Sequence, residues 1–106
     1  MGATRDEARR LLEAWQAGSV TAPAVKAWAQ AAVVEGDAVL AELQAELDLL
    51  DVYLLTAEDV PALVALLDGQ EVRAALDAWL AYQRTIDLDA RSKALKRDPF
   101  YRDFCR

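Results

Sequence analysis

Leucines recur at spacings of three and four residues through the middle of the chain, at Leu40, Leu43, Leu47, Leu50 and Leu54. Side chains with this spacing share one face of an α-helix. No part of the sequence keeps the apolar–polar alternation of a half-buried strand for more than a few residues. The leucine repeat is too short for a free-standing coiled coil. It therefore predicts a central helix of a bundle, beginning at a cap on Asp37 and running to about Leu55.

Capping residues divide the first half of the chain into helical segments. Thr4, with a glutamate three residues later, forms a capping-box pattern, and Thr21 is a second N-cap candidate. Glycines at positions 18, 36 and 69 are placed to end segments. These signals predict two short helices before the leucine-rich one.

Three further segments follow the leucine-rich helix. The fourth has two candidate N-caps, Thr56 and Asp59, and the pattern does not choose between them. The fifth begins near Gln70, and the pattern allows it to end near Leu88 or to continue to Leu95. Asp98 and the proline after it form an N-cap pattern that predicts a short C-terminal helix.

Composition agrees with a helical chain. Alanine occurs 22 times and leucine 16 times, against four glycines and three prolines, a mixture that favours helix over strand. The 106 residues suffice for one hydrophobic core but not for two. The expected fold is all-α, a single domain over residues 1–106, built as a compact bundle of about five helices plus a short C-terminal helix.

The residue types present limit the chemistry that this chain can perform. There is no histidine and only one cysteine, Cys105, so an intrachain disulfide and a Cys/His zinc site are both impossible. Without histidine the usual general base is missing, and Cys105 lies next to the chain end, a poor place for a preorganised site. No glycine-rich phosphate loop occurs. We expect a protein that is not an enzyme, with no catalytic residue, metal ligand or cofactor.

The apolar runs also bear on location. No stretch of about 18 apolar residues is present, and no apolar run follows a basic start. We expect no signal peptide, no membrane association and a cytoplasmic location, with which a lone cysteine agrees.

Charge is distributed very unevenly along the sequence. The net charge is −6, yet residues 91–106 contain six basic residues and only two acids. Between Lys26 and Arg73 there are ten acids and no lysine or arginine. One interpretation is a solvated surface whose acids also serve helix N-termini. The other is a binding face, with the repulsion between acids offset by the basic tail or by a basic partner.

The candidate partner-binding residues lie on the leucine-rich helix and just after it: Glu42, Glu46, Asp48, Asp51 and Tyr53. Glu42 and Glu46 form a like-charged i,i+4 pair, which costs an isolated helix about 0.2–0.5 kcal/mol. Tyr53 is a candidate exposed anchor beside these acids. We expect Trp28 and Trp79 to be core residues, and the aromatic cluster at residues 100–104 to close the bundle.

Two alternatives come from the same region. Carboxylates paired as Glu42-x-x-x-Glu46 and Asp48-x-x-Asp51 resemble the glutamate-rich helix of all-α, MazG-like nucleotide pyrophosphohydrolases. That resemblance implies Mg²⁺ and a second acidic motif on a neighbouring helix, which this chain does not supply. Nucleic acid is not an expected partner, because Lys26 is the only cation on the helix that would read DNA.

The stretch LLEAWQAGSVTA at residues 11–22 resembles the opening of small helical bacteriocin-immunity proteins. Those bacterial proteins are short, acidic and cytoplasmic, and they neutralise basic nuclease toxins by covering their active sites. The resemblance gives our main hypothesis its most concrete form: a module that binds a basic protein partner through an acidic helical face, as an immunity or antitoxin protein binds a toxin. A homodimeric structural or adaptor protein is the first alternative, and the Mg²⁺-dependent enzyme the second.

Overall fold

The computed structural model describes residues 2–106 and shows only helices, turns and loops in that range. The prediction of an all-α fold is therefore confirmed for the described chain. The six α-helices are α1 (Arg5–Gln16), α2 (Ala22–Ala31), α3 (Ala38–Asp48), α4 (Val60–Leu67), α5 (Val72–Gln83) and α6 (Leu88–Leu95). Two short 3₁₀ turns accompany them, η1 (Ala57–Asp59) before α4 and η2 (Arg102–Phe104) near the C-terminus.

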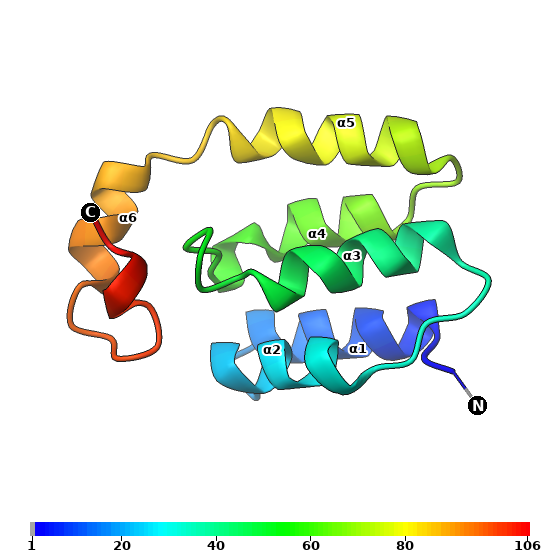
Figure 1. Ribbon diagram of the computed structural model, residues 1–106, viewed down its shortest axis with the longest axis horizontal. Coiled ribbons are helices and arrows are strands. Elements are labelled where there is room, and N and C mark those ends of the chain that lie inside the picture. The colour runs from blue at the N-terminus through cyan, green and yellow to red at the C-terminus, as the bar shows by residue number, and fades with distance from the viewer. Residues whose placement is uncertain (1) are drawn as a thin grey trace.

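The first five helices lie side by side, and α6 and η2 close one end of the bundle (Figure 1). The adjacent helices α3 and α4 run through the middle of the assembly. The pair α1 and α2 covers one side of them and α5 covers the other. No helix of the described chain is long and apolar enough to cross a membrane.

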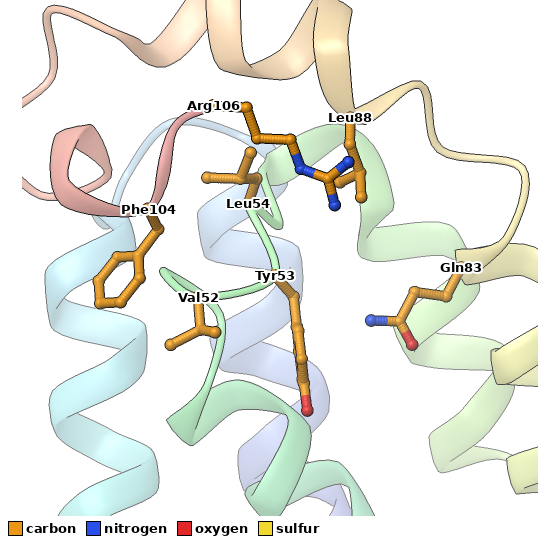
Figure 2. Close-up of a pocket in the computed structure, with 7 residues that line it drawn as sticks. All are labelled: Val52, Tyr53, Leu54, Gln83, Leu88, Phe104 and Arg106. Atoms are coloured by element: carbon orange, nitrogen blue, oxygen red, sulfur yellow. The ribbon is translucent and has the colours of Figure 1, made fainter.

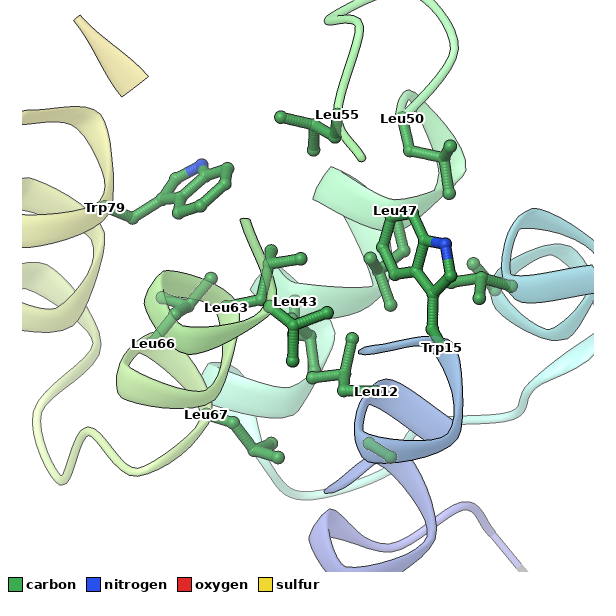
Figure 3. Close-up of a cluster of buried hydrophobic side chains, with 14 of the residues drawn as sticks. Leu12, Trp15, Leu43, Leu47, Leu50, Leu55, Leu63, Leu66, Leu67 and Trp79 are labelled. Carbon is green, nitrogen blue, oxygen red and sulfur yellow. The ribbon is translucent and has the colours of Figure 1, made fainter. Parts of the chain in front are cut away.

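The predicted leucine repeat forms the centre of the core. All five of its leucines are at most 2 % exposed. Leucines from α1 and α4 complete the cluster, which Trp15 borders on the α1 side and Trp79 on the α5 side (Figure 3). Trp79 is a core residue as predicted, whereas Trp28 is only partly buried and donates to Glu7 Oε1 over 3.1 Å.

The helix that carries the repeat is shorter than its spacing predicts. It ends at Asp48, and residues 49–54 form turns closed by the Leu55 N–H on the Leu50 carbonyl at 2.9 Å. Leu54 takes a left-handed conformation with φ 56°. Because of these turns, the consecutive residues Leu54 and Leu55 both point into the core. In a helix, two consecutive side chains would point about 100° apart.

Most predicted caps are present. The side chains of Thr4, Thr21 and Asp37 each accept a backbone N–H of the first turn that they cap. Both N-cap candidates of the fourth segment are used: Thr56 is the N-cap residue of η1, and Asp59 is that of α4.

The C-terminal part differs from expectation in its detail. The fifth segment stops at Gln83, and Asp87 caps a separate helix, α6, by accepting the Ala90 N–H at 3.0 Å. The predicted short C-terminal helix is a turn and the 3₁₀ segment η2. Its aromatic residues do close the bundle in part, since Tyr101 is 3 % exposed and donates its hydroxyl to the Leu55 carbonyl.

Candidate functional site

Most acids of the acidic interval, the stretch between Lys26 and Arg73, already have partners inside the chain. Five of its acids form ion pairs through their carboxylates: Asp37 with Arg5, Asp51 with Lys26, Asp68 with Arg9, and both Asp59 and Glu58 with Arg91. A sixth, Glu71, caps α5 by accepting the N–H groups of Arg73 and Ala74. Six of the ten acids therefore already have partners within the chain.

Arg5 illustrates how such a pair also serves the fold. Its Nε and Nη2 donate to the two oxygens of Asp37 at 2.7 and 2.9 Å. Its Nη1 donates to the carbonyls of Leu67 and Gly69, both at 2.9 Å, where α4 ends. One guanidinium thus connects α1 with the start of α3 and the end of α4, and it holds the pKa of Asp37 below its usual value.

Asp59 is the most deeply buried of these acids, with no exposed surface. It accepts the Arg91 Nη1 and Nη2 donors at 2.5 and 2.8 Å, the Tyr82 hydroxyl at 2.5 Å and the Thr56 N–H at 2.8 Å. Arg91 belongs to the basic tail, so one residue of that tail does fold back on the acids. Burial and the neighbouring Asp59 raise the pKa of Tyr82. Sequence reasoning did not identify this pair, because nothing in a single sequence links positions 32 residues apart.

The other four acids of the interval neither form an ion pair nor cap a helix within residues 2–106: Glu35, Glu42, Glu46 and Asp48. Three of them lie on α3. Positions on a helix advance by about 100° per residue, which places Glu42 and Asp48 on opposite edges of its outer face. Between these carboxylates lies a stripe of solvent-exposed apolar residues: Ala38, Ala41, Ala45 and Leu49. We call this surface the α3 outer face.

Glu46 differs from its neighbours because it turns toward α5. Its Oε2 is buried without a hydrogen-bond partner, and so is Nε1 of Trp79, the indole it faces. Burial raises the pKa of Glu46, the indole N–H opposes that rise, and the charge on Glu42 adds to it. The two atoms do not reach hydrogen-bonding geometry, so this contact leaves a carboxylate under-solvated at the α3–α5 interface.

A shallow groove runs along one edge of the α3 outer face, between α2 and α3. Its volume is about 420 Å³, and it is lined by Ala29, Gln30, Ala41, Gln44, Ala45 and Asp48. Gln44 fixes its base by donating to the carbonyls of Ala29 and Ala32 at 2.9 and 2.6 Å. The small alanine side chains leave the groove open to solvent, and Asp48 places a carboxylate on its rim.

The structure separates the five predicted partner-binding residues. Glu42, Glu46 and Asp48 are all half-buried, and only Glu42 and Asp48 flank the α3 outer face. Asp51 is only 9 % exposed, and its Oδ1 accepts Lys26 Nζ at 2.8 Å and the Val52 N–H at 3.0 Å. Tyr53 lies on the turn after α3, where it lines a different recess. Sequence reasoning missed the exposed alanine stripe, although its three- and four-residue spacing was visible.

The carboxylates of α3 do not form a metal site with side chains from other elements. Within residues 2–106 no group of three or more acidic or cysteine side chains is placed to hold a metal ion. Glu46 faces Trp79 of α5, whereas Glu42 lies at the edge of the α3 outer face.

Comparison of the chain with protein-family models, with curated proteins and with solved structures finds no match.

Proposed function

We propose that this protein is a binding module whose α3 outer face receives a basic segment of another protein. The observation that carries the proposal is the contrast among its acids. Six of the ten in the acidic interval are engaged within the chain, whereas Glu42 and Asp48 have no cationic partner in the described structure and flank an exposed apolar stripe.

The chemistry of this face fits one kind of partner. Alanine side chains let another helix or an extended segment approach closely, and Leu49, 39 % exposed, offers an apolar contact at one end. Lysine or arginine side chains on both sides of the partner segment would pair with Glu42 and Asp48. Unpaired charges of one sign accelerate association with an oppositely charged protein. An immunity or antitoxin protein that covers a basic toxin is the most concrete form of this activity.

Two observations favour this function over the alternatives. The five leucines of the central repeat are buried in the chain's own core, so they are not available for contact with a second copy. A second copy would also bring an acidic face against an acidic face, which is repulsive. A Mg²⁺-dependent enzyme is less well supported. The two glutamates of α3 face different neighbours, and the chain lacks the second acidic motif, on a neighbouring helix, that the resemblance to MazG-like enzymes implies.

Charge reversal on the α3 outer face tests the proposal. The tagged protein would be used to capture partners from native lysate at low and high salt, with quantitation by mass spectrometry. The test variant is Glu42→Lys/Asp48→Lys, and the control is Glu13→Lys/Asp77→Lys, which changes the net charge equally at exposed sites on α1 and α5.

A basic protein recovered at low salt should fall about tenfold or more with the test variant, since about 1.4 kcal/mol corresponds to one factor of ten. The control should retain it. Equal recovery with both variants would refute the role of this face. Circular dichroism establishes that all variants remain helical.

A further inference from the structure

A second recess lies away from the α3 outer face. It forms where the turn after α3, the end of α5, the start of α6 and the C-terminal segment meet (Figure 2). Its volume is about 150 Å³. Four apolar side chains make up most of its lining: Val52, Leu54, Leu88 and Phe104. Val52 and Phe104 are 41 % and 42 % exposed, so this recess accounts for two of the large apolar side chains that the fold leaves open to solvent.

Hydrogen bonds hold the walls of this recess in place. The Leu54 carbonyl accepts Arg91 Nη1 at 2.9 Å, which fixes a residue with a positive φ of 56°. The backbone N–H of Arg106 donates to Ser92 Oγ at 3.0 Å, and Ser92 is 2 % exposed. A left-handed conformation at a non-glycine residue is strained, and such strain gathers at ligand-binding sites. The recess is therefore preorganised rather than a gap between mobile segments.

One full charge faces the recess. The guanidinium of Arg106 extends over it beside Leu54 and Leu88, and the amide of Gln83 points toward the ring of Tyr53 (Figure 2). Arg106 forms no ion pair within residues 2–106. No acidic side chain is among the lining residues. Arg106 is therefore the only charged side chain in the lining that the described chain provides.

We infer that this recess binds a small monocarboxylate whose apolar body is about the size of a benzene ring. A cavity of 150 Å³ lined by aliphatic and aromatic side chains accommodates a benzene-sized molecule. The Arg106 guanidinium presents paired N–H donors that match a carboxylate. A single guanidinium favours a monoanion over a phosphate dianion, which needs more donors. The Gln83 amide supplies a further polar contact beside the apolar body.

Amide chemical shifts test this assignment directly. The isotope-labelled protein would be titrated with 3-phenylpropionate and, separately, with its uncharged amide, 3-phenylpropionamide. The variants are Arg106→Gln and, as a matched control, Arg102→Gln, an exposed arginine of the same segment that does not line the recess.

Saturable shifts are expected at Leu54, Gln83 and Leu88. Binding should weaken about tenfold both in Arg106→Gln and with the neutral amide, as for the loss of one charged hydrogen-bonding partner. Arg102→Gln should bind as the wild type does. Shifts elsewhere, no saturation, or equal affinity for the acid and its amide would overturn the assignment, and so would an Arg106→Gln variant that binds like the wild type.

Discussion

Replacing Arg91 by methionine should destabilise the protein strongly. Arg91 supplies two of the four hydrogen bonds that the fully buried Asp59 accepts, and a third to the Leu54 carbonyl. Methionine preserves much of the packing volume but leaves a buried carboxylate without its counter-charge. Breaking one side of a buried ion pair costs about 3–5 kcal/mol. That loss is a large share of the roughly 5–15 kcal/mol by which domains are stable.

Urea unfolding followed by tryptophan fluorescence measures this loss. With a slope of about 1.5 kcal/mol per molar urea, the midpoint should fall by about 2–3 M. The control is Arg9→Met, because its partner Asp68 has a side chain that is 54 % exposed. Such exposed pairs contribute little to stability, so Arg9→Met should leave the urea midpoint close to that of the wild type.

Two further results sharpen the test. Adding Asp59→Asn to Arg91→Met removes the stranded charge, so the double variant should be destabilised by less than the sum of the single changes. Amide hydrogen exchange should accelerate in α6, which Arg91 attaches to η1 and the turn after α3. If Arg91→Met costs no more than Arg9→Met, the reasoning about this buried pair is refuted.

Three other outcomes follow from single sites. Gly69→Ala should destabilise the protein by about 1–3 kcal/mol in urea unfolding, because the added Cβ would overlap the Cβ of Ala75; unchanged stability would refute this close contact. Glu46→Gln should stabilise the protein at neutral pH by up to about 1 kcal/mol. Burial raises the pKa of Glu46, so its stabilising contribution is present below the ordinary glutamate pKa and lost as pH rises through the raised value; the gain should vanish in acid. Asp37→Asn should show the opposite profile: Arg5 lowers the pKa of Asp37 below 3.8, so the contribution is present above that value and lost as pH falls through the lowered pKa. Stability measured against pH for both variants checks the two signs, and parallel curves for wild type and variant would contradict them.

Local signals in the sequence predicted most of the helices. Thr4, Thr21 and Asp37 cap where their side chains and spacing indicate, because an N-cap depends on residues only three positions away. The end of α3 was predicted wrongly. Leu50 and Leu54 continue the helical spacing, yet they reach the core from turns. Apolar spacing reports which residues are buried and cannot report which backbone buries them.

The candidate site was predictable only in part. The acidic interval indicated that α3 carries charge, and Glu42 and Asp48 remain available on its surface. The sequence could not show that Lys26 neutralises Asp51 or that Arg91 neutralises Asp59, because these pairs join positions 25 and 32 residues apart. Such pairings are set by helix packing, which one sequence does not encode in any local pattern.

The central claim, that the α3 outer face contacts a basic partner, is tested most directly by zero-length crosslinking of the captured complex. A carbodiimide joins carboxylates only to amines that they touch, and mass spectrometry identifies the joined residues. The structure leads us to expect crosslinks from Glu42 and Asp48 to lysines of the partner, suppressed by high salt. Crosslinks that arise only from acids on other helices, such as Glu13 or Asp77, would contradict the claim.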